Sequence, residues 1–527
     1  MLTLLTLPAL PAAAQTPAYA PRESVTVIPG AQYRAGGLHR AFFGTRYRAL
    51  WTTPIRVPLL DLKQFAGGLK PVRKGGGQQT HSLRLQGADG RLYQFRSVSK
   101  DPRAVLPPEL RDTWAAGILQ DQMSSAHPAG PAVVPPLLAA GGVLHTDPLL
   151  VQMPDDPALG EFRAEFAGLL GFIEVRPTTL AEEESNIGGA SKIVSTADLF
   201  KQLDDEPAVR VDDRAFLRAR LMDVFMGDWD RHDTQWRWAL VDSGGPARWM
   251  PIPLDRDQVF VRFDGFLLWQ ARRTVPQLLN FGPEYGEIIG ATWNGRDLDR
   301  RLLTGLERSV WDSTAAALKA KLTDAAIADA VAHLPSEFRP LDASRLEHAL
   351  KVRRDHLGEM KDKYYTLLAH QVDIYATDKA DEARVVREGD GTTLVTVAHK
   401  GQEYFQRRFT PRETQEVRIF LQGGDDRLSV EGPGRGSPLV RVIGGGGDDQ
   451  FSVSRSSGIH LYDDRGRNQA QGAGINRKSW RWKPDSLKPD ELPPRDWGND
   501  TFTLLSASYG YDVQAVVGYG GHTEWYA

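Results

Sequence analysis

Two short acidic segments, residues 227–236 and 253–257, carry the residue types best suited to chemistry. Each segment stands beside hydrophobic sequence. Their polar members are Asp228, Asp230, His232, Asp233, Gln235, Asp255 and Asp257. Carboxylates are rarely buried without a partner. A divalent cation prefers oxygen ligands and offsets the repulsion among acids. The two segments therefore predict a cation site and phosphoryl-transfer chemistry.

The residue types suggest a division of roles within these segments. Asp230 is the candidate catalytic carboxylate, which would orient an acceptor hydroxyl and accept its proton. Gln235 and Asp255 have hard oxygen atoms that suit a metal ion, and Asp257 is placed to bridge to a second one. His232 is assigned to the same catalytic loop.

A structural alternative exists for the same residues. The acids could form a salt-bridged loop around Arg231 and Arg256, with Asp228 and His232 bracing the loop through hydrogen bonds. Two linked acidic segments with tryptophans packed beside them favour a functional site over this alternative.

Upstream residues are candidates for holding phosphate groups. A glycine turn between strand-like segments can bring backbone N–H groups against phosphate oxygens, and a basic residue on the next strand can reach the same groups. The alternatives are a flexible turn and a surface arginine. The candidates are Gly75, Gly76, Gly77, Arg96 and Lys100, with Lys74 as a further possibility.

The composition is that of an ordinary globular protein. The chain has 527 residues, 41% hydrophobic and 25% charged, with a net charge of −3. Two or three domains are expected at this length. The charge gives no reason to expect a nucleic-acid partner. No cysteine is present, which excludes disulfides, zinc–thiolate sites and thiol nucleophiles.

The N-terminal segment predicts export. Residues 2–14 are apolar and end in three alanines, like the hydrophobic region and cleavage site of a signal peptide, although a basic start is missing. An apolar tail is the alternative. No later stretch is long and apolar enough for a spanning helix. We expect a periplasmic or outer-membrane-associated protein.

Sequence periodicity predicts an α+β protein with several regions. Strands are expected over 53–60, 82–85, 92–98, 133–138 and 149–153, a hairpin over 236–241 and 250–254, and helices over 108–126, 309–334 and 343–370. The expected regions are a signal peptide (1–20), a lead-in (21–50), a β-rich region (51–153), a helical region with the acidic segments (154–385), a β-rich repeat domain (386–490) and a linker with terminal strands (491–527).

An internal repeat marks the β-rich domain. Residues 417–430 are echoed by residues 440–453, 23 positions later. This spacing suits stacked coils of a β-solenoid or a pair of matched hairpins. The segment 444–452 also fits a calcium-binding nonapeptide with Asp449 as ligand, but the copies are not in tandem. We favour glycine turns capped by aspartates over a calcium site.

The pattern Gly-Asp-Trp-Asp-Arg-His-x-x-Gln, followed by Asp-x-Asp, resembles the active-site signature of atypical kinases. These include the CotH and HipA types, the phosphoinositide kinases and the secreted Golgi kinases. The resemblance covers about residues 50–370 and implies a two-lobed kinase-like domain that uses ATP with Mg²⁺ or Mn²⁺. It assigns Asp230 as the catalytic residue and Gln235 and Asp255 as metal ligands.

The sequence departs from that signature at two positions. Arg96 stands where kinases have a lysine, and Gln235 where they have an asparagine. Arginine does not mimic the compact ammonium of lysine at a tight phosphate site. No helix glutamate clearly pairs with Arg96, since Glu109 is early and Gln120 would be a substitution, as would Asp121. An inactive kinase is therefore an open alternative.

A second resemblance covers most of residues 45–527. The segments LWTTPIRVPLLDL, KPVRKGGGQQTHSLRL, YQFRSVSKDP and RLMDVFMGDWDRHDTQWRW are similar to a region of large bacterial outer-membrane proteins of the metallophosphoesterase-like and surface-antigen kinds, where it precedes a C-terminal β-barrel. The resemblance implies that the terminal strands begin such a barrel and that the chain is truncated. Metallophosphoesterase motifs are absent, so phosphatase activity does not carry over.

Three functions follow from these observations. The first is an extracytoplasmic kinase-like enzyme that transfers phosphate from ATP to a protein or small-molecule hydroxyl. The second is a catalytically inactive binding module of an outer-membrane assembly. The third is a cation-dependent phosphohydrolase that places water beside the same acids. The metal-ligand residues favour the first and third, whereas Arg96 and the scarcity of ATP outside the cytoplasm favour the second.

Overall fold

The computed structural model describes residues 19, 21–75, 80–101, 114–178, 187, 189–241, 247–272, 275–454, 456–463, 466–478, 503–505 and 521–523. The chain divides into two compact units. Unit 1 contains residues 1–194, 218–294 and 315–358, and unit 2 contains residues 195–217, 295–314 and 359–527. Helices and several separate sheets are present, which agrees with the expected α+β class.

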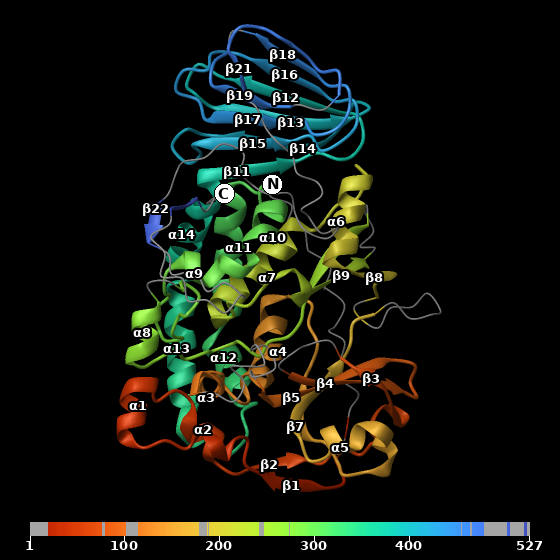
Figure 1. The fold of residues 1–527 in the computed structure, drawn as a ribbon, viewed down its shortest axis with the longest axis vertical. Coiled ribbons are helices and arrows are strands. Elements are labelled where there is room, and N and C mark those ends of the chain that lie inside the picture. Colours follow the sequence, from red (N-terminus) through yellow and green to blue (C-terminus); the bar gives the residue numbers. More distant parts are fainter. Residues whose placement is uncertain are drawn as a thin grey trace, which may run out of the picture. The chain divides into compact units, whose positions relative to one another are not determined.

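A five-stranded antiparallel sheet is the main β structure of unit 1 (Figure 1). Its strands, in spatial order, are β3 (Leu69–Lys74), β4 (Thr80–Gly87), β5 (Leu92–Lys100), β7 (Leu170–Val175) and β6 (Leu149–Gln152). The strands expected over 82–85, 92–98 and 149–153 are confirmed within β4, β5 and β6.

The two faces of this sheet have different character. Because side chains alternate along a strand, Tyr93 and Phe95 of β5 are buried on one face. Gln94 lies on the other face, where it pairs in register with Arg84 of β4 and with Glu174 of β7. Directly paired residues share a face, so this second face carries a row of polar side chains toward the candidate site.

The expected hairpin is confirmed. Strands β9 (Trp236–Val241) and β10 (Arg248–Pro253) pair antiparallel, and β8 (Lys192–Ser195) is the third strand of their sheet. Trp236, Trp238 and Trp249 are buried. The first acidic segment enters the hairpin and the second leaves it, so the hairpin brings both segments to the same end.

One expected strand is a helix. Residues 133–138 lie within α4 (Gly130–Gly141), which has Pro131 in its first turn and ends at Gly142 with a left-handed φ of 69°. A short apolar run does not distinguish a buried strand from a buried helix, whereas an early proline and a final glycine are typical of helix ends. Helix α4 packs against α12 (Asp324–Val331).

The remaining elements of unit 1 are short. Strands β1 (Ser24–Val27) and β2 (Ile55–Pro58) form a separate antiparallel pair. The helices are α1 (Gly37–Phe43), α2 (Arg48–Thr52), α3 (Trp114–Gln122), α5 (Arg163–Phe166), α8 (Phe266–Ala271), α9 (Ile288–Thr292) and α13 (Ser344–Asp355). Much of the helix expected over 108–126 lies outside the described residues.

Three helices have residues in both units: α7 (Asp213–Met226), α11 (Arg308–Lys321) and α14 (Leu357–His370). The long helix expected over 309–334 is two helices, α11 and α12. Thr323 ends the first and caps the second, since its side chain accepts a hydrogen bond from the amide of Ala326. The helix expected over 343–370 is likewise divided into α13 and α14, at His356.

Unit 2 contains two larger sheets (Figure 1). In one, β11 (Gln371–Tyr375), β15 (Glu416–Phe420), β17 (Leu439–Ile443), β19 (Ile459–Tyr462) and β21 (Ile475–Lys478) are parallel. The other has the order β14 (Gln402–Phe409), β13 (Thr393–His399), β12 (Asp381–Arg387), β16 (Arg427–Glu431), β18 (Gln450–Ser454) and β20 (Gln469–Gln471). Helices α6 (Thr196–Asp205) and α10 (Arg296–Leu302) belong to the same unit.

The repeat corresponds to successive coils. Val417 pairs with Val440, and Leu428 pairs with Phe451, each in parallel register and 23 residues apart. Hairpin partners would be antiparallel, so the parallel pairing is that of stacked solenoid coils. The valine and isoleucine side chains of these strands form one buried core.

Aspartates at the turns connect one coil to the next. Asp426 Oδ1 accepts a hydrogen bond of 2.7 Å from the amide of Asp381, and Asp449 Oδ1 accepts one of 2.8 Å from the amide of Asp426. Asn468 Oδ1 accepts the corresponding bond from Asp449 at 2.9 Å. This arrangement is the favoured capping role. Calcium at Asp449 stays a prediction.

Two further observations concern the whole chain. Strands β22 (Thr503–Leu505) and β23 (Gly521–Thr523) form an antiparallel pair near the C-terminus. A search of the described residues for a helix of the length and hydropathy needed to cross a bilayer returned none.

Candidate active site

Strand β5 directs two basic side chains at the second acidic segment. Arg96 forms an ion pair with Asp255, and Lys100 forms one with Asp257. Positions 96 and 100 are four residues apart, so their side chains point to the same face of the strand. The structure therefore brings together the predicted phosphate-binding residues and two of the predicted metal ligands.

Asp255 has an unusual backbone conformation. It follows strand β10 with a φ of 52°, in the left-handed region that non-glycine residues seldom adopt. The backbone amide of Leu254 is held by the carbonyl of Gln235 at 2.9 Å. Such strain costs about 1–3 kcal/mol and is concentrated at functional sites. Here it turns the Asp255 carboxylate toward β5.

The charges around the two carboxylates differ. Burial raises the pKa of Asp255, and the nearby Arg96 only partly opposes that effect. Burial also acts on Asp257, but there Lys100 and Arg96 prevail and lower the pKa to about 2. Asp257 is therefore ionised at any physiological pH, and it depends on Lys100 for its neutralisation.

Asp230 and His232 lie at the partly exposed side of the site. The Asp230 side chain is 28% exposed and its Oδ1 accepts a hydrogen bond of 2.8 Å from Asn294. His232 Nε2 is 3.9 Å from the same oxygen. A hydrogen bond to Asp233 raises the pKa of His232. Asp230 thus has a fixed orientation and a cationic neighbour, with room for a further partner.

Gln235 connects the two acidic segments. Its Nε2 donates to Asp255 Oδ2 at 3.3 Å and lies 3.3 Å from His232 Nε2. Rotation of the amide by 180° would instead present its oxygen beside the carboxylate, since the two ends of an amide are nearly alike in size. The predicted ligands Gln235, Asp255 and Asp257 therefore lie together, as oxygen donors or potential donors.

Asp228 belongs to a buried structural network rather than to the open site. Its Oδ2 accepts a hydrogen bond of 2.8 Å from Arg256, which also pairs with Asp223. Arg231 lies in the same network and donates to the carbonyl of Leu254 at 2.7 Å. Burial raises the pKa of Asp228 to about 6. The salt-bridged-loop alternative thus describes Asp228, as a brace between the two segments.

The glycine turn is described only in part. The amide of Gly75 donates to the carbonyl of Ser82 at 2.7 Å. Gly76 and Gly77 lie outside the described residues. The alternative candidate Lys74 pairs with Glu165, away from the acidic segments.

The helix residues considered as partners of Arg96 are engaged elsewhere. Gln120 donates to the hydroxyl of Tyr33 at 2.8 Å, and Asp121 pairs with Arg48 at 2.7 Å. Glu109 lies outside the described residues. Arg96 has Asp255 as its partner instead.

Sequence reasoning missed two residues of the site. Glu174 of β7 lines the cavity and accepts a hydrogen bond of 2.5 Å from Thr146, and burial raises its pKa. A lone glutamate inside the apolar run of residues 169–175 was the available signal. Asn294, the partner of Asp230, had no comparable signal because it is 64 residues away in the chain.

Two cavities adjoin this group of residues. One, of about 460 Å³, is lined by arginines and by the acidic residues. The other, of about 320 Å³, has more apolar walls, including Val134, Phe172 and Phe263. Both are lined by Arg96, Lys100, Glu174, Asp230 and Asp255. These five residues therefore face two compartments, as a site that joins two ligands requires.

Comparisons with known proteins show no family. No family model matches the chain, and no curated protein matches it. Among solved structures, the proinflammatory kinase CtkA of Helicobacter pylori is 11% identical with a TM-score of 0.29, covering 58% of this chain and 99% of that chain. A structure of WaaP in complex with acyl carrier protein is 12% identical with a TM-score of 0.18, covering 48% and 89%. Both TM-scores are below 0.5, so the resemblances to atypical kinases and outer-membrane proteins stay predictions.

Proposed function

We propose that the protein is a cation-dependent phosphotransferase that moves a phosphoryl group from ATP to a hydroxyl of a protein or small molecule. The supporting observation is one cavity in which basic residues of β5 and the acidic segments meet. Its lining includes Arg96, Lys100, Asp230, His232, Gln235 and Asp255. Positioning and electrostatic stabilisation, which these residue types supply, are the main needs of phosphoryl transfer.

The donor atoms of the site suit a hard divalent cation. Asp255 and Asp257 are close enough for their carboxylates to interact, and the amide of Gln235 lies beside them. Mg²⁺ takes few protein ligands and leaves its remaining positions to water and phosphate. Gln235, Asp255 and Asp257 would hold Mg²⁺ or Mn²⁺, which would draw charge from the transferring phosphoryl group.

The residues of the chain have distinct tasks in such a reaction. Asp230, oriented by Asn294, accepts the proton of the acceptor hydroxyl. The bond between the terminal phosphorus and the donor oxygen breaks while the acceptor oxygen bonds to that phosphorus. Arg96 and Lys100 exchange their aspartate partners for phosphate oxygens. Protonated His232 offsets negative charge beside Asp230.

A second candidate function is a binding module without catalysis. The ion pair between Arg96 and Asp255 favours it, because each group is neutralised by the other. A phosphohydrolase would use the same residues with water as the acceptor. The three functions differ in whether phosphate is transferred, released or merely bound.

The expected location is part of the proposal. The apolar residues 2–14 support export, and we propose a periplasmic or outer-membrane-associated protein whose partners are a nucleotide and an unidentified acceptor. Proteomic fractionation of the native host would test this location.

The test of the proposed activity is ³¹P NMR of the full chain incubated with ATP and Mg²⁺. We expect cation-dependent loss of the γ-phosphate signal, slowed by about 10²-fold or more in Asp230→Asn. Asp155→Asn is the matched control, because Asp155 is an exposed acid of the same unit. Equal rates for Asp230→Asn and the control would refute the role of Asp230. Inorganic phosphate as the sole product would identify a hydrolase.

A further inference from the structure

Three arginines gather at one side of the 460 Å³ cavity. Arg84 comes from β4, Arg176 directly follows β7, and Arg237 comes from β9. Arg73 of β3 pairs in register with Arg84 and adds a fourth positive charge. We call Arg84, Arg176 and Arg237 the arginine cluster. Three separate strands thus direct guanidinium groups into one space, beside the candidate active site.

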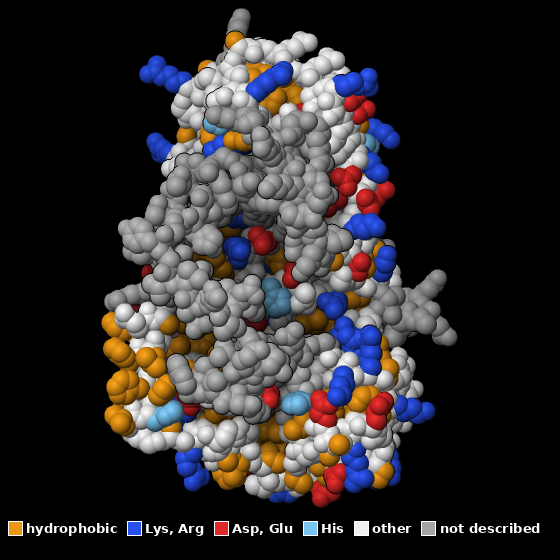
Figure 2. All heavy atoms as spheres, viewed as in Figure 1, with side chains coloured by type: hydrophobic (Ala, Val, Ile, Leu, Met, Phe, Trp, Pro, Cys, Tyr) orange, Lys and Arg blue, Asp and Glu red, His pale blue; other side chains and the backbone are white. Residues whose placement is uncertain are grey.

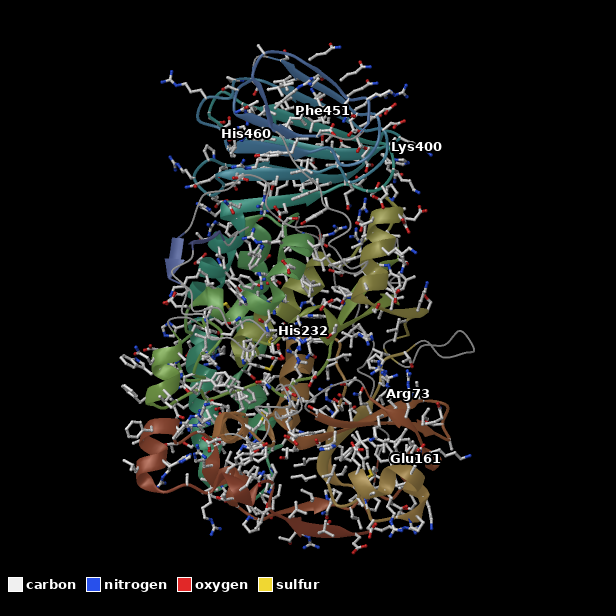
Figure 3. All side chains as sticks on the ribbon, viewed as in Figure 1. Arg73, Glu161, His232, Lys400, Phe451 and His460 are labelled. Carbon is white, nitrogen blue, oxygen red and sulfur yellow. The ribbon has the colours of Figure 1, made fainter. Side chains whose placement is uncertain are left out.

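The visible surface agrees with this arrangement. Figure 2 shows Lys and Arg side chains gathered over β3 and β4. Figure 3 labels Arg73 of β3 and His232 of the acidic loop on the same visible face. Positive charge is therefore present on the side from which a ligand would approach His232.

The arginines of the cluster repel one another. Burial lowers the pKa of Arg84, and the neighbouring Arg73 and Arg237 lower it further. Burial, together with Arg84 and Arg237, lowers the pKa of Arg176 to about 10. Like charges in a partly desolvated space are unfavourable, so the cluster would be stabilised by an anion.

The carboxylates of the cavity have partners outside the arginine cluster. Glu174 accepts from Thr146, Asp230 accepts from Asn294, and Asp255 pairs with Arg96. The neutral Gln94 accepts a hydrogen bond of 2.7 Å from Arg176 and fixes the position of its guanidinium. These three acids are therefore engaged with other groups, and the cluster keeps its positive character toward the cavity.

We propose that the arginine cluster binds a small molecule carrying two or more phosphate groups, one at the cluster and another beside Arg96 and Lys100. Guanidinium groups recognise phosphate with paired hydrogen bonds. The cavity volume is in the range of small-ligand sites. The arginine-lined side offers little apolar surface for a flat base. The ligand class is thus linear polyphosphate or a multiply phosphorylated ring.

This inference deepens the proposed function and rests on it only for the second phosphate position. The binding of the polyanion to the cluster requires neither a metal nor Asp230. Failure of phosphoryl transfer and failure of polyanion binding are therefore separate outcomes.

The test is calorimetric titration of the full chain with tripolyphosphate, inositol hexakisphosphate, ATP and adenosine, without divalent cation. We expect tripolyphosphate or inositol hexakisphosphate to bind at least as tightly as ATP, and adenosine not to bind. Preference between the first two identifies a linear or a ring-shaped ligand. Each of Arg84→Gln and Arg237→Gln should weaken binding about tenfold or more.

Two controls keep the result interpretable. Arg163→Gln makes the same charge change at an exposed arginine of unit 1 and should leave binding unchanged. Asp255→Asn should retain metal-free binding even if it abolishes turnover. Adenosine that competes with ATP, or equal binding by the cluster variants and Arg163→Gln, would overturn the proposal. Two independent single substitutions guard against loss of folding in either one.

Discussion

The two units both bury aspartates, but they neutralise them in different ways. In unit 1 the partners are cationic side chains: Asp255 pairs with Arg96 and Asp257 with Lys100. In unit 2 the partners of Asp426 and Asp449 are backbone amides of the preceding coil. A side-chain cation can exchange one anion for another, whereas a backbone amide within a sheet turn has no such freedom.

Protonation follows the same division. In unit 2, burial raises the pKa of Asp449 to about 6 and that of Asp426 to about 9. In unit 1, the pKa of Asp257 is about 2 despite burial, because of Lys100. Asp228, with a pKa of about 6, is the exception within unit 1. Aspartates of the candidate site are thus charged and exchangeable, and those of the solenoid are structural.

The largest expected effect is on the network that braces the candidate site. Asp223→Ala would leave Arg220 and Arg256 without a buried carboxylate partner. Removing one member of a buried ion pair costs about 3–5 kcal/mol. Urea unfolding followed by tryptophan fluorescence should show this loss. Asp155→Ala, at an exposed ion pair, is the control and should not shift the midpoint. Similar midpoints for both variants would mean that the network is not a brace.

A smaller effect of opposite sign is expected in the solenoid. Asp449→Asn keeps the acceptor for the amide of Asp426 and removes a charge, as Asn468 already does in the next coil. A raised folded pKa gives stability below about pH 4 that is lost as the pH rises through about 6. The variant should therefore stabilise unit 2 at pH 8 by about 1–2 kcal/mol.

Hydrogen exchange of peptides from residues 416–454 in the full chain measures this change in unit 2 alone. At pH 8 their protection should be higher in the Asp449→Asn variant than in the wild type, and the difference should shrink toward pH 4. Greater protection of the wild type at pH 8 would show that Asp449 is charged and bound to a cation, which is the calcium alternative.

The smallest effect is expected one residue away. Asp448 pairs with Arg467, whose side chain is 91% exposed, at 2.6 Å. Exposed ion pairs contribute little because water and salt screen them. Arg467→Gln should leave the exchange of residues 416–454 unchanged at every pH. A clear loss of protection would mean that the turn depends on side-chain charge, contrary to the contrast between the units.

Local patterns in the sequence predicted much of this arrangement. The hairpin of β9 and β10 follows from alternation and tryptophan content, and it places the two acidic segments at one end. The 23-residue repeat predicted the coil spacing, and parallel pairing selected the solenoid over hairpins. Arg96 was identified from its place on a strand beside an apolar flank. The catalytic roles of these residues stay predictions.

Interactions between distant residues could not be predicted in this way. The partner of Asp230 is 64 positions away, and the strand carrying Glu174 joins β5 only through the sheet order. The left-handed turn at Asp255 accompanies its pairing with Arg96, which lies far from it in the chain. The run 133–138 is apolar in either a helix or a strand, so its pattern did not decide between them.

The most direct test of the account is a Mn²⁺ titration followed by electron paramagnetic resonance, with and without tripolyphosphate. Wild-type protein and Asp255→Asn are compared, because asparagine also tolerates a left-handed φ and removes the charge. The account predicts phosphate-dependent Mn²⁺ binding by the wild type and its loss in the variant, with Asp155→Asn unaffected. Equal binding by all three proteins, or no binding by the wild type, would contradict the claim that the site aspartates exchange their cations.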